Sequence, residues 1–373
     1  MQIAEFELER YFARWEFAVR HVLCASDAEP IALANLLSLA DDDSRQRWET
    51  LHLGYTESLG LPALRAEIAN LYPGLAPDDI ITFAGAEEGV FLCMQALVGP
   101  GDHAVVAWPA YQSLHEVARA AGGEITLVPL DPRNWSLDVD AVAAAMRPNT
   151  KVIVVNSPHS PTGAQLSPEQ LNRLISIAEL HGAFLFSDEV YRFLEHSAAE
   201  LSPAAACSPR AISLGVMSKA FGLAGLRIGW LALRDATLRA RIARLKDYTT
   251  ICNSAPSEIL ALMALRAKDA LLTRTRKIMS ENLSLLDGFF ARNAERFSWV
   301  RPRASSVGFP KWLGGSVDEF AARLVEREGV LILPASRFGY PGNYFRLGFG
   351  RRDMPEALAK MESFASQSFA SPG

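Results

Sequence analysis

The stretch that decides the fold is AISLGVMSKAFGLAGLRIGWLAL, residues 211–233. Nearly all of its residues are apolar or small, yet it contains two cations, Lys219 and Arg227. Four glycines interrupt the run, which argues against a membrane span. The pattern predicts two buried strands joined by a loop that carries Lys219.

Lys219 stands out because its neighbours are apolar or small. An ammonium group in apolar surroundings costs free energy unless it is paired or gives up its proton. A lysine that gives up its proton is a good nucleophile toward carbonyl groups. The same pattern also fits a lysine that extends from a strand end toward water, so residues elsewhere in the chain must decide between the two.

Working outward, short apolar runs alternate with helical patterns over much of the chain. The apolar runs are residues 80–85, 103–109, 124–130, 151–158, 183–189, 211–215 and 227–233. Helical patterns lie between them near residues 87–98, 111–121, 138–146 and 168–181. Near-continuous apolar strands separated by helices indicate a sheet covered on both faces. We therefore predict an α/β fold with a central, mostly parallel sheet.

The 373 residues exceed what one minimal core needs, and the pattern changes beyond about residue 265. There, long charged helices and a few short strands follow. We expect a large domain at 46–265 and a smaller α+β lobe at 266–373, completed by residues 1–45. The N-terminal segment predicts an amphipathic helix with Phe12, Trp15, Val19 and Val22 near one face.

Composition excludes several classes of protein. A net charge of −5 gives no reason to expect nucleic acid binding, and 49% hydrophobic with 21% charged residues is typical of globular proteins. The four cysteines have no short spacing, which argues against a zinc site and a disulfide framework. The N-terminus lacks the apolar core of a secretory signal. We expect a cytoplasmic protein with no membrane or nucleic acid partner.

Polar residues follow several of the predicted strands, at the edge where ligands bind in open α/β sheets. Asn156 and Asp188 close two runs, Tyr111 follows another, and residues 85–87 open a helix whose backbone N–H groups suit an anion. Each has a structural alternative. Asp188 could instead be a helix N-cap, and residues 85–87 could form an ordinary strand-to-helix turn. Tyr111 and Tyr191 could simply pack in the core.

Signatures of other chemistries are missing from the sequence. No G-x-G-x-x-G follows a strand, and no G-x-x-x-x-G-K occurs for a nucleotide phosphate. The serine-nucleophile motifs S-x-x-K and G-x-S-x-G do not occur. The histidines show no H-E-x-x-H spacing, so we expect no metal site.

Taken together, these residues resemble the fold type I pyridoxal-phosphate (PLP) enzymes, and within them the class I/II aminotransferases, the aspartate-aminotransferase-like enzymes. Single matches are weak, but their order over most of the chain is specific. The matching segments are YTESLGLPALR with Tyr55, GAEEGVF with Gly85, PAYQSL with Tyr111, NSPHSPTG with Asn156, SDEVY with Asp188, SKAFGLAGLRIGW with Lys219, LPASRFG, and YFRLGFG with Arg346.

The resemblance implies catalytic roles for Lys219, Asp188 and Tyr191. Lys219 forms a Schiff base with the cofactor aldehyde and then moves a proton as general base and acid. Asp188 keeps the pyridine nitrogen protonated, and Tyr191 donates a hydrogen bond to O3′. Arg346 holds the substrate α-carboxylate. The implied cofactor-binding residues are Tyr55, Gly85, Ala86, Glu87, Tyr111, Asn156, Ser160, Asp188, Tyr191, Ser218, Lys219 and Arg227, with Arg346 and Asn156 implied for the substrate.

Two positions depart from the family pattern. Ser160 replaces the Asn of N-P-T-G, which touches O3′ and the substrate carboxylate in relatives; Asn156 or a water molecule is expected to serve instead. Val216 replaces a phosphate-binding Ser, for which Ser218 is a partial substitute. These changes leave the superfamily assignment intact but bear on the type of reaction.

The resemblance implies a homodimer with shared active sites, because Tyr55 reaches the phosphate of the neighbouring subunit. The implied activity is transfer of an amino group between an α-amino acid and a 2-oxo acid. A same-fold β-elimination lyase, cyclase or decarboxylase is the alternative. A non-catalytic PLP-binding protein is a further alternative, but the intact Lys219, Asp188, Tyr191 and Arg227 set favours catalysis.

Overall fold

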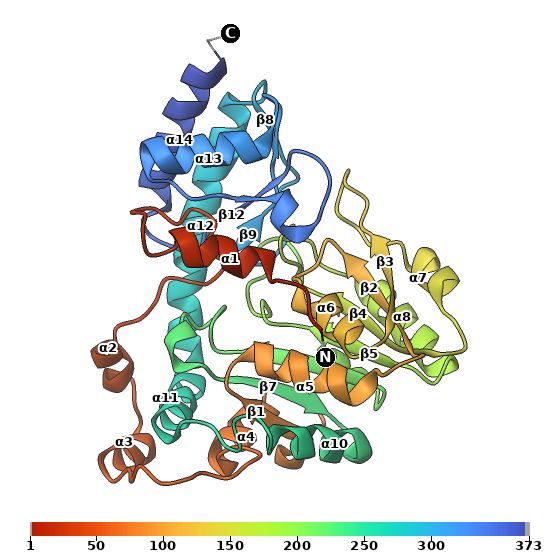
Figure 1. Ribbon diagram of the computed structural model, residues 1–373. Coiled ribbons are helices and arrows are strands. Elements are labelled where there is room, and N and C mark those ends of the chain that lie inside the picture. Colours follow the sequence, from red (N-terminus) through yellow and green to blue (C-terminus); the bar gives the residue numbers. More distant parts are fainter. Residues whose placement is uncertain (1, 370–373) are drawn as a thin grey trace.

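A seven-stranded sheet forms the centre of the computed structural model, in which residues 2–369 are described (Figure 1). Its strands are β1 (Ile80–Phe83), β2 (His103–Trp108), β3 (Glu124–Pro129), β4 (Thr150–Asn156), β5 (Phe184–Asp188), β6 (Ala211–Val216) and β7 (Gly229–Leu233). The spatial order is β1-β7-β6-β5-β4-β2-β3, and β7 runs antiparallel to the other six strands. All seven predicted strands and the α/β fold class are therefore confirmed.

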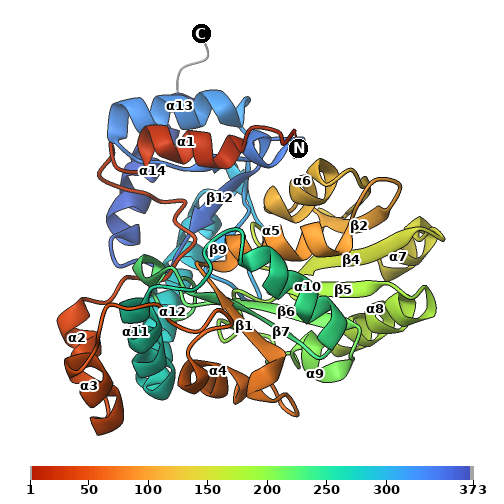
Figure 2. The same ribbon diagram turned by 60° about the horizontal axis from the view of Figure 1, so that its bottom comes forward.

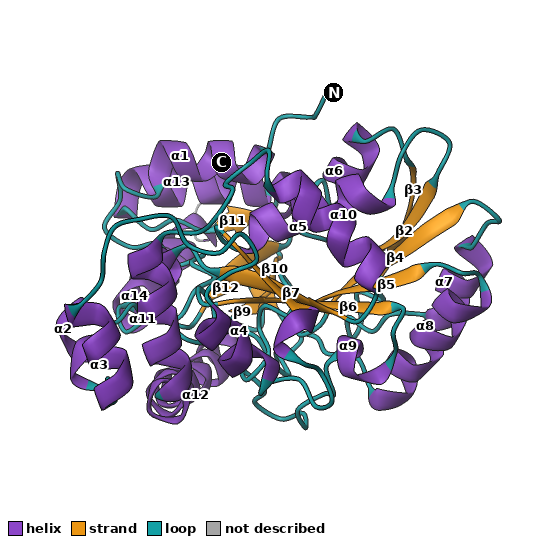
Figure 3. Ribbon diagram, turned by 90° about the horizontal axis from the view of Figure 1, so that it is seen from below, coloured by secondary structure: helices purple, strands orange, loops and turns teal. Residues whose placement is uncertain are grey.

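Helices cover both faces of this sheet (Figures 2 and 3). One face carries α5 (Ala86–Leu97), α6 (Ser113–Ala120) and α10 (Ala236–Lys246); the other carries α7 (Val139–Ala145), α8 (Pro168–Leu180) and α9 (Ala204–Cys207). Every residue of β6 and β7 is buried as a result. The double burial explains why these strands read as continuous apolar runs rather than as alternating ones.

The chain then leaves the sheet through two helices, α11 (Ala255–Arg266) and the long α12 (Lys268–Arg292). Short strands and helices follow: β8 (Phe297–Ser298), β9 (Val307–Gly308), β10 (Lys311–Trp312), α13 (Val317–Glu328), β11 (Leu333–Pro334), β12 (Phe345–Gly348) and α14 (Met354–Phe369). This agrees with the predicted change of pattern near residue 265. Within residues 2–369, no helix combines the length and apolar character needed to cross a membrane.

The N-terminal helix is shorter than predicted. Helix α1 spans Glu7–Trp15, so Val19 and Val22 lie beyond it. The chain then becomes extended, because His21 N donates to Gly329 O (3.2 Å) and Leu331 N donates to His21 O (2.8 Å). These backbone hydrogen bonds to a distant segment replace the helix that the sequence pattern predicts for residues 16–22. Helix α1 itself contacts the 3₁₀ helix η3 (Ala335–Phe338).

The rest of the N-terminal segment follows a different course. Helices α2 (Leu33–Ser38) and α3 (Asp42–Glu49) pack against α11, away from α1 (Figure 1). Helix α4 (Pro62–Ala69) then leads into β1. The division of the chain at residues 45 and 265 stays a prediction.

Candidate active site

A cavity of about 370 Å³ lies where β4, β5 and β6 end. Segments predicted from separate motifs meet there. The predicted site residues that line it are Ala86, Glu87, Tyr111, Asn156, Ser160, Asp188, Tyr191, Ser218, Lys219, Arg227 and Arg346. Gly85 directly precedes Ala86 at the start of α5, whereas Tyr55 does not line the cavity and is 92% exposed.

Asp188 is a buried carboxylate whose charge is only partly compensated. It is 6% exposed, and one oxygen accepts a hydrogen bond from Val190 N (3.2 Å). Its other oxygen has no hydrogen-bond partner among the described residues. Burial raises the pKa of Asp188 to about 7, against the lowering effects of the Val190 N–H and Lys219. Such a carboxylate suits a cationic partner, which favours its ionised form.

Asn156 holds the turn beside Asp188. The two residues are paired across β4 and β5. The Asn156 amide donates to Asp188 O (2.9 Å) and accepts from Ser160 N (2.6 Å). An amide group offers two donors and two acceptor sites, so Asn156 keeps one N–H for a ligand.

The loop between β6 and β7 presents Lys219, as predicted. Met217 N donates to Ile228 O (3.0 Å) and closes the loop. Lys219 Nζ donates to Ser26 Oγ (2.9 Å) and lies 5.7 Å from the ring centroid of Tyr191. The amine therefore faces the cavity between the Tyr191 ring and the N-terminal segment.

The first turn of α5 and Arg227 form a basic corner of the cavity. The first backbone N–H groups of a helix have no intrahelical partner and carry partial positive charge. The Glu87 carboxyl accepts from Ser113 Oγ (3.1 Å), and burial raises its pKa to about 7. Val216, which replaces the expected phosphate-binding Ser, lines the cavity, and so does its partial substitute Ser218. The Ser218 Oγ has no hydrogen-bond partner among the described residues.

Gly85 allows the close approach of Arg227 in this corner. Its φ is +92°, and a Cβ atom added there would lie 2.5 Å from Arg227 Nη2. We expect Gly85→Ala to weaken the binding of a phosphorylated cofactor by about tenfold or more, because the added Cβ would displace the Arg227 guanidinium, and a hydrogen bond to a charged group is worth about 1.5–3 kcal/mol. Equilibrium dialysis with pyridoxal phosphate measures the effect. The exposed Gly101→Ala, also at positive φ but with open space around it, is the control; equal losses in both variants would contradict the role of Gly85.

Arg346 lies on the opposite wall, on β12. It is 3% exposed, and its Nε donates to Cys24 O (3.1 Å). Its guanidinium carbon lies 5.6 Å from the Phe12 ring centroid and 5.8 Å from that of Phe338. Neither Nη atom has a hydrogen-bond partner among the described residues. This leaves a fork of N–H donors for a carboxylate in the cavity.

Sequence reasoning missed the contribution of the N-terminal segment to this cavity. The additional lining residues from it are Leu8, Glu9, Phe12, Glu16, Ala25, Ser26 and Asp27. Glu9 also accepts a hydrogen bond from the Tyr111 hydroxyl (3.0 Å). The sequence does show the helical spacing of Glu9, Phe12 and Glu16, but a helical face exposed to solvent has the same spacing. Ser26 carries no local signal, because it is 193 positions from Lys219.

The donor set fits the cofactor that the sequence predicts. A phosphate suits the basic corner of Arg227 and the α5 N-terminus, where the missing Cβ of Gly85 leaves room. The free oxygen of Asp188 suits a protonated ring nitrogen, and the Lys219 amine suits an aldehyde. Tyr111 lines the same cavity and offers an aromatic face.

Comparisons with known proteins agree with this geometry. Residues 46–360 match the family model for aminotransferase class I and II. Capreomycidine synthase from Streptomyces vinaceus is 34% identical over 308 residues, which cover 81% of this chain and 78% of that protein. Among solved structures, a PLP-dependent aminotransferase from Streptococcus suis 89-1591 has a TM-score of 0.92 at 29% identity and covers 99% of this chain and 98% of its own. The PLP-dependent cyclase OrfR has a TM-score of 0.90 at 29% identity, with 98% of each chain covered.

Proposed function

Because the chain belongs to the class I and II aminotransferase family, whose enzymes depend on pyridoxal 5′-phosphate, we propose that Lys219 attaches this cofactor and that Asp188 and Tyr191 act with it. The protein is an aminotransferase that moves an amino group between an α-amino acid and a 2-oxo acid. The observation that carries the assignment of residues is that the Lys219 amine, the free Asp188 oxygen and the Arg346 guanidinium share one cavity.

Each residue has a distinct task in this proposal. The bound cofactor supplies an electron-withdrawing ring that makes the Cα–H of the substrate acidic. Lys219 Nζ removes the Cα proton and returns a proton at C4′ of the cofactor. Asp188 holds a proton at the ring nitrogen, and Tyr191 donates to O3′. Arg346 fixes the substrate α-carboxylate through its two free Nη groups.

A single-turnover experiment tests this function. Single amino acids are added to the holoenzyme without a 2-oxo acid, and the absorbance of the cofactor is followed. An aminotransferase converts the cofactor to its amine form in an amount equal to the 2-oxo acid released. Failure of the full set of proteinogenic amino acids to give this conversion would contradict the proposal.

A cyclase is the second candidate function, and a specific observation favours it. Ser160 stands where the family has an Asn that touches O3′ and the substrate carboxylate, and Ser160 N is held by Asn156 (2.6 Å). The chain is also similar to capreomycidine synthase and to the cyclase OrfR. In a parallel experiment with an amino acid that carries a leaving group on its side chain, a cyclase closes the ring as that group departs and returns the cofactor unchanged, so mass spectrometry of the product separates the two functions.

We propose a homodimer in which Tyr55 faces the partner subunit. Apolar side chains are exposed around it, with Leu53 at 84% and Tyr248 at 87%. The hydrogen bond from Thr56 Oγ1 to Asn253 O (3.3 Å) links the Tyr55 segment to the loop that follows α10. Analytical ultracentrifugation is expected to give about twice the 40.8 kDa of one chain. A monomer at micromolar concentration would contradict the proposal.

We also propose that the protein resides in the cytoplasm. Its four cysteines are free, and Cys24 and Cys93 are buried. Free cysteines in this number favour a reducing compartment.

A further inference from the structure

One wall of the cavity carries carboxylates rather than cations. Glu9 and Glu16 come from α1 and its C-terminal cap, and Asp27 comes from the segment that follows. Glu16 has helical dihedral angles (φ −55°, ψ −40°), so Glu9, Phe12 and Glu16 lie on one helical face. This acidic wall, defined by Glu9, Glu16 and Asp27, belongs to the same cavity as Lys219.

The three carboxylates differ in their partners. Asp27 is neutralised by Arg351, whose Nη2 donates to both of its oxygens (2.9 Å each). Glu9 accepts only the neutral hydroxyl of Tyr111 (3.0 Å). The Glu16 carboxylate has no hydrogen bond or ion pair among the described residues, and burial and Asp27 raise its pKa. Glu9 and Glu16 therefore form no ion pair with a cation among the described residues, and Arg351 and Arg346 lower the pKa of Glu16 only from a longer distance.

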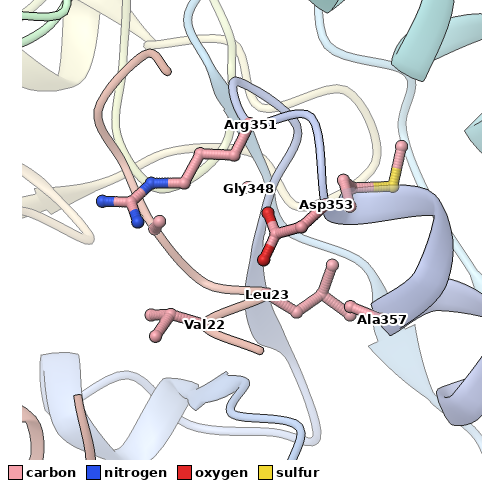
Figure 4. Close-up of a pocket in the computed structure, with 8 residues that line it drawn as sticks. Val22, Leu23, Gly348, Arg351, Asp353 and Ala357 are labelled. Atoms are coloured by element: carbon pink, nitrogen blue, oxygen red, sulfur yellow. The ribbon is translucent and has the colours of Figure 1, made fainter. Parts of the chain in front are cut away.

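Arg351 does not open a second site. It lines a separate small pocket together with Leu23, Gly348 and Asp353 (Figure 4). That pocket has a volume of about 10 Å³, room for one water molecule at most. The pairing of Arg351 with Asp27 is thus structural, and the free negative charge of the acidic wall faces the large cavity.

The proposed function assigns a task to each cation that lines the cavity. These cations are Lys219, Arg227 and Arg346, assigned to the cofactor aldehyde, the phosphate and the α-carboxylate. A substrate with a second carboxylate would meet Glu9 and Glu16 without a cation from this chain. Repulsion between like charges in one cavity disfavours the binding of such a substrate.

The position of Arg346 relates the acidic wall to the substrate. Arg346 is 3% exposed with both Nη groups free, and it lies over the Phe12 ring. Phe12 stands between Glu9 and Glu16 on the same helical face. A substrate whose α-carboxylate binds Arg346 therefore has α1 beside it, in the cavity that Glu9 and Glu16 also line.

Resting on the proposed function, we propose that the substrate is an α-amino acid with a cationic side chain, an ammonium or a guanidinium, which Glu16 and Glu9 bind. Carboxylates bind guanidinium groups through paired, charge-assisted hydrogen bonds and ammonium groups as point charges. The substrate cation supplies the charge that the acidic wall lacks. A neutral side chain of equal shape would leave Glu16 without a partner and Glu9 with only the Tyr111 hydroxyl, which disfavours binding in a partly buried site.

Spectral titration of the holoenzyme tests the substrate class. Arginine and ornithine are compared with citrulline, which has the shape of arginine without its charge, and with aspartate and glutamate. Arginine or ornithine is expected to bind at least tenfold more tightly than citrulline, and the dicarboxylates more weakly still. Glu16→Gln is expected to weaken arginine binding about tenfold or more, with a several-fold smaller loss for citrulline.

Glu5→Gln is the matched control, because it removes the same charge from an exposed residue near α1 that does not line the cavity. It should bind arginine like the unchanged protein. Equal affinity for arginine and citrulline, tighter binding of aspartate, or equal losses in Glu16→Gln and Glu5→Gln would each overturn the inference while leaving the aminotransferase intact. A spectrum that responds to no amino acid would overturn the proposed function and the inference together.

Discussion

Lys219→Ala is expected to reduce transamination by about 10⁴-fold or more, the upper end of what one positioned proton-transfer group contributes. In the proposed mechanism this amine both attaches the cofactor and moves the Cα proton, so the substitution removes both functions. Asp188, Arg227 and the α5 N-terminus remain in place, so the cofactor is expected to bind without a covalent bond. Borohydride reduction followed by mass spectrometry of peptides checks this: the adduct at residue 219 should disappear.

The control for this experiment is Lys277→Ala. Lys277 is exposed on α12 and does not line the cavity. It should keep the adduct at Lys219 and full turnover. A Lys219→Ala protein that turned over at the normal rate, or an adduct at another lysine, would remove the basis of the assigned site.

The sheet was predictable because its strands are buried on both faces. β4 and β6 have buried residues at almost every position, so each reads as a short apolar run between helical patterns. The chemistry was predictable for a related reason. Asn156 and Asp188 each end such a run, and neighbouring parallel strands bring their carboxyl ends to the same edge. Local sequence therefore determines which residues meet.

The acidic wall was not predictable in this way. Glu9 and Glu16 have the spacing of residues on one face of a helix. The sequence does not distinguish a helical face that lines a cavity from one that is exposed to solvent. Their position depends on pairing between His21 and residues 329–331, which are more than 300 positions away. The same pairing ends the helical course of the chain near Trp15 and brings Ser26 to Lys219. Contacts between residues so far apart in the sequence leave no pattern in the local sequence.

The shared use of one cavity by the two ends of the chain also has a consequence for specificity. Lys219 and Asp188, to which we assign the reacting groups, come from the loop after β6 and the end of β5, whereas Glu16 and Arg346, to which we assign substrate contacts, come from the C-terminal cap of α1 and from β12. Changes in the terminal segments can therefore alter substrate choice while the reacting groups stay fixed.

Asp188→Ala is expected to slow removal of the Cα proton by about 10²–10⁴-fold while weakening cofactor binding only about tenfold. In the proposed mechanism the carboxylate would hold a proton at the ring nitrogen and alanine could not, so the Cα–H of the substrate would become far less acidic. Its own energetics fit this task, since burial raises the pKa of Asp188 to about 7 and a cation opposite it lowers that pKa again. Loss of deuterium from Cα-deuterated substrate measures the first effect, and equilibrium dialysis of the cofactor measures the second.

The next residue along the chain provides the matched control for Asp188→Ala. Glu189 is equally buried, but its Oε1 accepts from Ala204 N (2.8 Å) and Ser213 Oγ (2.8 Å), and it does not line the cavity. Glu189→Gln should leave deuterium loss close to normal even where stability falls. If Asp188→Ala lost cofactor affinity and proton removal by the same factor, the carboxylate would be holding the cofactor in place rather than activating it, because a purely anchoring group lowers both together.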